Sequence, residues 1–194
     1  MKTRIILSML ILGLIGASCA KEPLTRDAGF VFSETGEPIA TKTSDVSWNS
    51  FTANVSGFGW QCKNTRRILD DGSLEKGNYW EYRDGGGPSV YYFSQESFTR
   101  YFSIPRFVNS RVYQLLSFDY NNGAIIPRYD DGSNERALMR LTKITKDSFY
   151  CVELLGYQGV DGKPIYGYSL YKKLSASDLA ALREEYSTDY LTLK

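Results

Sequence analysis

The sequence predicts an all-β fold: an antiparallel up-and-down meander of 8–9 strands closed into a barrel, with a short N-terminal helix and a C-terminal helix packed outside. Turn sequences recur at nearly regular intervals, with Asp-Gly at 71–72, 131–132 and 161–162 and Asn-Gly at 122–123. These pairs supply the positive φ that tight hairpins need. The runs between them are rich in aromatic and β-branched residues, which favour strands. Every link is too short for a crossover, so neighbouring runs are expected to pair as hairpins.

Nine runs are expected to form strands. They cover residues 60–68, 78–83, 89–94, 98–104, 112–120, 124–129, 137–145, 149–155 and 165–173. In the run at 112–120, apolar residues point to both faces, with Val112, Leu116 and Phe118 on one and Tyr113 and Leu115 on the other. In a sheet with one solvent-exposed face, apolar and polar residues alternate along each strand. Both faces of this sheet are therefore expected to be partly covered by other parts of the protein.

The first 18 residues have the layout of a secretory signal peptide. Lys2 and Arg4 precede an apolar run at 5–15, and the small residues Gly16 to Ser18 come directly before Cys19. This arrangement resembles a bacterial lipobox, with Gly16 where that motif usually has Leu. The resemblance implies that Cys19 is acylated and becomes the new N-terminus. The apolar run is shorter than the ~20 residues that a spanning helix needs. We therefore expect a cell-envelope protein, lipid-anchored at the outer membrane on its periplasmic or surface face.

Residues 19–46 are polar and are expected to form the lipidated N-terminus and a tether, while residues 47–194 form the folded domain. The short run at 29–32 could dock as a strand. Ser47 can cap a helix that carries Trp48, Phe51 and Val55 on one face and ends before Gly57. Near the C-terminus, Ser175 and Asp178 have the spacing of a capping box before a second helix.

Together these elements resemble a lipocalin or calycin barrel, and more narrowly the small lipocalin-like lipoproteins of Gram-negative gut bacteria. The residues that carry the resemblance lie at 57–60, 79–80, 91–93 and 168–173. Phe58 occupies the place of the lipocalin Gly before Trp60. Lipocalins place a basic residue of the last strand against that Trp, a role that the resemblance gives to Lys172 or Lys173.

The chain has three cysteines. If Cys19 is acylated, Cys62 and Cys151 are left, and an oxidising envelope would let them form a disulfide. Barrel closure would pair the first strand with one of the last, which could make these two cysteines neighbours. Both could equally be buried free thiols, which behave as small apolar residues.

Composition argues against several classes of function. There is no histidine, and the formal net charge is +1. The first fact removes the commonest general base and zinc ligand, so we expect no enzyme, no metal and no cofactor. The second leaves no cationic surplus for nucleic acid. Glu75, Glu81, Asp119 and Glu153 could be paired as glycosidase acids, but nothing local brings two of them together.

Two further motifs are read as turns or loops. The tetrad Asp-Asp-Gly-Ser occurs at 70–73 and again at 130–133, where calcium binding is the alternative to plain hairpin turns. The spacing is not that of an EF-hand, which favours turns. The run Gly-Gly-Gly-Pro at 85–88 lacks the Lys-Ser or Lys-Thr of a phosphate-binding loop.

The aromatic residues are the best functional lead. Six of them could line a ligand cavity: Trp60, Trp80, Tyr92, Tyr101, Tyr113 and Tyr168. The alternative is that they fill the core or cover the outside. We expect a monomer that binds a small apolar or amphipathic molecule, or a glycan fragment, inside the barrel. The alternative is a filled barrel that docks a protein or a polysaccharide through an exposed aromatic patch.

Overall fold

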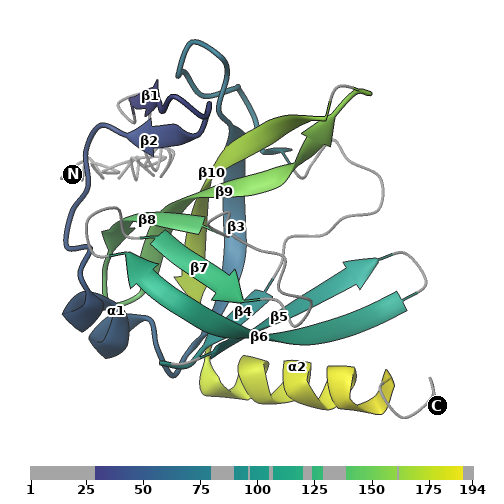
Figure 1. The fold of residues 1–194 in the computed structure, drawn as a ribbon. Helices are drawn as coiled ribbons and strands as arrows, with labels where there is room; N and C mark the ends of the chain where they lie inside the picture. Colours follow the sequence, from purple (N-terminus) through teal and green to yellow (C-terminus); the bar gives the residue numbers. More distant parts are fainter. Residues whose placement is uncertain are drawn as a thin grey trace, which may run out of the picture.

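The computed structural model describes residues 29–79, 90–95, 97–104, 107–119, 124–128, 139–160 and 162–189. The elements, in chain order, are β1 (Phe30–Phe32), β2 (Pro38–Ala40), α1 (Trp48–Asn54), β3 (Gly59–Arg67), β4 (Val90–Phe93), β5 (Ser97–Ile104), β6 (Phe107–Asp119), β7 (Ala124–Arg128), β8 (Met139–Ile144), β9 (Ser148–Gln158), β10 (Lys163–Lys173) and α2 (Ala176–Asp189). The described chain is therefore mostly β with two helices, as predicted (Figure 1).

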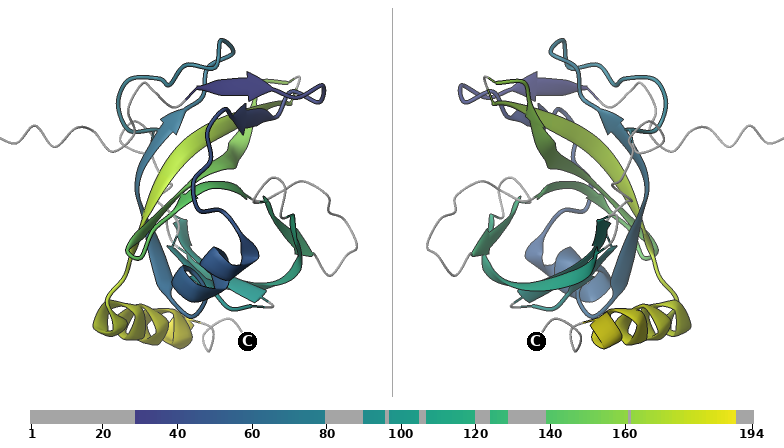
Figure 2. Two further views of the ribbon diagram at one scale, coloured as in Figure 1. Left: turned by 90° about the vertical axis from the view of Figure 1, so that its left-hand side faces the viewer. Right: turned by 90° about the vertical axis from the view of Figure 1, so that its right-hand side faces the viewer.

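The larger sheet is antiparallel throughout. Its strands are hydrogen-bonded in the order β10-β3-β4-β5-β6-β7-β8-β9, and β9 pairs in turn with β10. The order of neighbours is thus a ring, and the strands curve around an interior in a barrel-like arrangement (Figure 2). The shortest contact joins β7 to β8, through Ala124 opposite Arg140 and Ile125 opposite Met139.

Eight of the nine expected runs correspond to strands. The remaining run, at 78–83, falls largely on residues outside the described part. The strand expected from residue 112 starts earlier, because β6 begins at Phe107. Ile104 pairs with Phe107, so the link that was expected to span 105–110 needs only two residues. Several strands also carry β-bulges, which shift the register between β3 and β10 at Leu170/Tyr171.

Both helices start where the sequence predicts. Ser47 caps α1 in a capping box with Ser50, which takes the place of the usual Glu or Gln. Gly57 follows α1 with φ of 84°, a conformation that costs glycine little. Ser175 Oγ accepts the amide of Asp178 at 3.0 Å, which satisfies one of the free N–H groups at the start of α2, and it donates to the Asp178 carboxylate at 2.7 Å.

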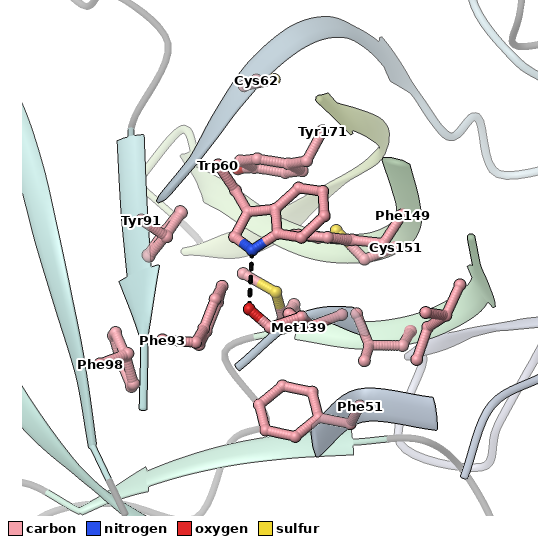
Figure 3. Packing of buried hydrophobic residues seen from close by; sticks show 13 residues of the cluster. Phe51, Trp60, Cys62, Tyr91, Phe93, Phe98, Met139, Phe149, Cys151 and Tyr171 are labelled. Carbon is pink, nitrogen blue, oxygen red and sulfur yellow. Dashed lines mark hydrogen bonds between the residues drawn. The ribbon is translucent and has the colours of Figure 1, made fainter. Parts of the chain in front are cut away.

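Aromatic side chains fill the end of the interior next to α1. We call this set the aromatic core, and it comprises Phe51, Trp60, Tyr91, Phe93, Phe98, Phe149 and Tyr171 (Figure 3). All are at most 1% exposed. Phe149 stacks on Tyr171 with ring centroids 4.8 Å apart, and Phe51 of α1 meets Phe93 edge-on at 5.9 Å. The helix α1 thus supplies an apolar side chain that closes this end.

The short sheet β1–β2 covers the outer face of β9 and β10. Phe30 meets Tyr168 edge-on at 5.2 Å and packs in a cluster with Ile68 and Val152. The expected tether at 19–46 therefore contains a folded hairpin, and its run at 29–32 does form a strand. The outer face of the sheet is covered here by a hairpin as well as by the predicted C-terminal helix.

Residues 1–28, which include the expected signal segment and Cys19, lie outside the described part. Within the part that is described, neither helix has the length and apolar character needed to cross a bilayer.

The second helix, α2, lies outside the strands. Its Leu179 approaches Gly59 of β3 so closely that a Cβ on Gly59 would be 2.8 Å from Leu179 Cδ1.

We predict that Phe51→Ala lowers the free energy of unfolding by about 3–5 kcal/mol, because it opens a cavity in a core that is fully buried. Phe58→Ala is the matched control, since Phe58 is 37% exposed and its loss should cost no more than about 1 kcal/mol. Urea unfolding followed by tryptophan fluorescence measures both. Similar losses for the two variants would show that α1 does not close the interior.

Candidate functional site

Five side chains from three strands form a hydrogen-bonded group on the inner wall, next to the aromatic core. This inner polar cluster comprises Cys62 and Thr65 of β3, Glu153 of β9, and Ser169 and Tyr171 of β10. Glu153 is 8% exposed, and Thr65 and Ser169 are fully buried. Cys151 and Phe149 lie two and four residues before Glu153 on the same face of β9, and both belong to the buried core.

The protons of this cluster point toward Glu153. Ser169 Oγ donates to Glu153 Oε1, and Tyr171 Oη donates to Oε2 at 3.0 Å. Because Ser169 has one proton to give, its 2.7 Å bond to Thr65 must be donated by Thr65. Thr65 then accepts from the Cys62 thiol, which is 3.1 Å away. The carboxyl group is the terminal acceptor of a chain that crosses from β3 through β10 to β9.

Burial determines the protonation of these groups. It raises the pKa of Glu153, against the hydrogen bonds from Ser169 and Tyr171 and the positive charge of Arg100. Burial also raises the pKa of the Cys62 thiol to about 12, and that of Cys151 well above its usual range. Both thiols are therefore protonated at neutral pH and are poor nucleophiles.

Trp60 joins the aromatic core to the end of α1 and to the last residue of β10. Its indole Nε1 donates to the carbonyl of Val55 at 2.9 Å, which ties β3 to the residue after α1 (Figure 3). Lys173 Nζ lies 3.4 Å from the centroid of Phe58 and 5.4 Å from that of Trp60. The basic residue beside the Trp is thus Lys173, and Lys172 is exposed.

The structure separates the predicted ligand-binding aromatics. Trp60 lies in the aromatic core and is fully buried. Tyr168 faces the outer wall, where its hydroxyl is 3.1 Å from Thr142 Oγ1. Tyr92 and Tyr101 also face outward, because Arg183 of α2 lies 4.3 Å from the ring of Tyr92 and hydrogen-bonds to both tyrosines. These three tyrosines therefore do not line the interior.

The other two predicted residues are Tyr113 and Trp80. Tyr113 is opposite Phe98 in the register of β5 and β6, and its side chain lies outside the described part, as does all of Trp80. The inward-facing neighbour of Tyr92 is Tyr91, which is 1% exposed. Alternation along β4 cannot distinguish the two tyrosines until the pairing with β3 and β5 is known. Glu153 could have been recognised as a carboxyl on the apolar face of β9.

Cys62 and Cys151 are buried free thiols, so the disulfide that could join them is not formed. The first strand of the larger sheet, β3, does pair with the last, β10, but Cys151 lies one strand further on, in β9. Cys62 is opposite Tyr171 of β10, and Cys151 is opposite Ser169 on the other side of β10. Two strand spacings separate the cysteines by about 10 Å, beyond the Cα distance that a disulfide spans.

The described part of the chain contains no group of three acidic or cysteine side chains that could hold a metal ion. The turn at 70–73 has Gly72 at φ of 78°, and Asp71 accepts the amide of Ser73 at 2.9 Å. It is thus a plain turn stabilised by its own aspartate. The corresponding tetrad at 130–133 and the glycine run at 85–88 lie outside the described residues.

A small hollow lies on the outer wall between β2, β8, β9 and β10. Its lining includes Glu37, Pro38, Arg140 and Tyr166, and its volume is about 10 Å³. That is room for roughly one water molecule, so this hollow is too small for the expected ligand. The inner polar cluster is the stronger candidate site.

No protein-family model, no curated protein and no solved structure matches this chain.

We predict that the unfolding free energy of the wild type falls relative to that of Glu153→Gln as the pH rises. Because burial raises the pKa of Glu153, the folded chain holds this proton more tightly than the unfolded chain does. The protonated carboxyl makes its full contribution to the free energy of unfolding below the pKa of the unfolded chain, about 4.3. That contribution is lost as the pH rises from this value through the pKa of the folded chain. The slope can reach at most about 1.4 kcal/mol per pH unit.

Urea unfolding of both proteins between pH 4 and pH 8 measures the difference. Ser169→Ala should steepen the dependence, because it removes a hydrogen bond that favours the carboxylate. A constant difference between wild type and Glu153→Gln across this range would contradict the burial argument.

Proposed function

We propose that this chain is a lipid-anchored, lipocalin-like carrier of the cell envelope that binds a small apolar or amphipathic molecule, or a glycan fragment, and performs no chemistry. In this proposal the ring of strand pairings closes into a barrel, and the inner polar cluster holds the polar end of the ligand. The anchor at Cys19 rests on the sequence around it.

The observation that carries the proposal is the carboxyl group of Glu153 on the inner wall. A carboxyl is rarely buried unless it is paired, because burial removes its hydration. Two hydroxyl donors support Glu153, and a protonated carboxyl also has an O–H to donate. Such a group can orient the polar end of a ligand whose remaining surface contacts apolar side chains.

The layering of the interior supports the same function. The aromatic core fills the end next to α1, and the polar cluster follows it along β3, β9 and β10. Beyond the cluster, Leu155 contacts the inner face at Gly167 and is half-buried. In the ring order β6, which carries Tyr113, lies four strands from β10 in either direction and is thus opposite it. A ligand would lie between these walls.

The lipocalin-like assignment is supported by the surroundings of Trp60. This residue is on the first strand of the ring, directly after the helix that closes one end, and Lys173 of the last strand lies against its ring. That is the arrangement which the resemblance implies for a lipocalin.

The second candidate is a docking module with a filled barrel. The dense aromatic core favours it, because Trp60, Tyr91 and Phe149 are at most 1% exposed and leave no room for a ligand at their end. In that case the polar cluster would serve only to fix the strands.

We predict that the protein extracted from its own envelope carries a small molecule that native mass spectrometry detects. Glu153→Gln and Ser169→Ala should each lower its occupancy about tenfold, because a bound polar group would lose its buried partner. Tyr168→Phe is the matched control, since it removes a hydroxyl from the outer wall, and it should leave the occupancy within about twofold. A wild type that carries no small molecule, or a stoichiometric protein in its place, would contradict the carrier function.

A further inference from the structure

The β1–β2 hairpin has one buried and one exposed apolar face. Phe30 is paired with Ala40, and both pack on the outer wall of the larger sheet. The next pair, Val31 and Ile39, points the other way and is 54% and 39% exposed. Phe32 at the end of β1 returns to the side of Phe30 and is 40% exposed at the rim of the hairpin. We call Val31 and Ile39, the pair on the exposed face, the hairpin patch.

This hairpin is held firmly on the molecule. Glu37 forms an ion pair of 2.7 Å with Arg140 of β8, and Thr41 N–H donates to the carbonyl of Gly29 at 2.9 Å. The turn that follows β3 packs against β1 so closely that a Cβ on Gly72 would clash with the Phe30 carbonyl oxygen. The hairpin patch is therefore presented in a fixed orientation.

The chain leading to the hairpin suggests what covers the patch. Only residues 20–29 separate Cys19 from β1. Ten residues span at most about 35 Å when fully extended. If Cys19 carries the lipid, as the proposed function requires, the hairpin stays within that distance of the bilayer surface, which gives it a high effective concentration there.

The size and charge of the patch fit a lipid surface. Its two side chains expose roughly 150 Å², whereas a stable protein interface buries about 800 Å² on each partner. The exposed charges beside it have both signs, with Glu34 in the turn and Lys42 after β2. Contact therefore does not depend on anionic lipid. We propose that the hairpin patch inserts into the headgroup boundary of the anchoring membrane and orients the barrel on it.

The test uses the full chain, produced in a Gram-negative host that processes lipoproteins and reconstituted in phosphatidylcholine vesicles. A bimane fluorophore is attached to Val31→Cys, Ile39→Cys or Phe58→Cys, and the vesicles contain doxyl-labelled lipid. Phe58 is the matched control, because it is 37% exposed and lies beside the opposite end of β3, about 30 Å away. Cys62 and Cys151 are buried, and labelled wild type gives their background. Near-UV circular dichroism verifies the fold of each variant.

We expect the doxyl lipid to quench bimane at positions 31 and 39 by at least about twofold, and to leave bimane at position 58 nearly unchanged. Equal quenching at all three positions would overturn the inference, and so would disulfide-linked dimers through position 31, which would show that a second copy covers the patch. An alkaline carbonate wash separates this failure from that of the proposed function. If the wash removes wild type as completely as Cys19→Ser, the anchor is absent and both proposals fall. If wild type stays bound and the bimane at positions 31 and 39 is not quenched, only the inference fails.

Discussion

The structure depends on the pairing of β3 with β10, the first and last strands of the larger sheet. This pairing joins parts of the chain about a hundred residues apart, and the Thr65–Ser169 hydrogen bond spans 104 residues. It brings Lys173 against Trp60 at the end next to α1, and it assembles the inner polar cluster further along the same strands. Without it, Ser169 would lose its hydrogen bond to Thr65, and the hydrogen-bonded chain that ends at Glu153 would no longer reach β3.

The aromatic core and the polar cluster have different energetic roles. Stacked rings such as Phe149 and Tyr171 stabilise the fold by burying apolar area, at about 25 cal/mol per Å². The polar cluster adds little net stability, because each hydrogen bond replaces one to water, yet leaving any member without its partner would be costly. Because a shifted register would leave buried polar groups unpaired at a high cost, the cluster fixes the register of β3, β9 and β10 around Glu153.

Local interactions are the part of the fold that the sequence predicts well. Ser47 and Ser175 cap their helices through atoms a few residues away, and the Asp-Gly turn at 71–72 bends the chain by itself. The hairpin β1–β2 was harder to foresee, since three-residue strands are stabilised by Phe30 packing on a distant wall. The start of β6 at Phe107 likewise follows from its pairing with Ile104.

The candidate site could be predicted only in part, for the same reason. Which of Tyr91 and Tyr92 points inward is set by pairing and by bulges, because a shift of one residue exchanges the two faces of a strand. Tyr92, Tyr101 and Tyr168 were expected inside and face α2 or the β1–β2 hairpin. The carboxyl of Glu153 was visible in the sequence, but its hydroxyl donors are 16 and 18 residues away.

The pairing of β3 with β10 can be tested most directly by cross-linking. Gln61 and Lys172 are opposite each other in this register, so cysteines at both positions would have Cα atoms about 4.5–5.5 Å apart, within disulfide range. We predict a nearly complete disulfide between them on oxidation, seen by peptide mapping without reductant. Lys63→Cys with Lys172→Cys is the control and should stay reduced, because Lys63 lies at the bulge, two residues further along β3. No disulfide at 61–172, or equal linkage in both variants, would contradict the account.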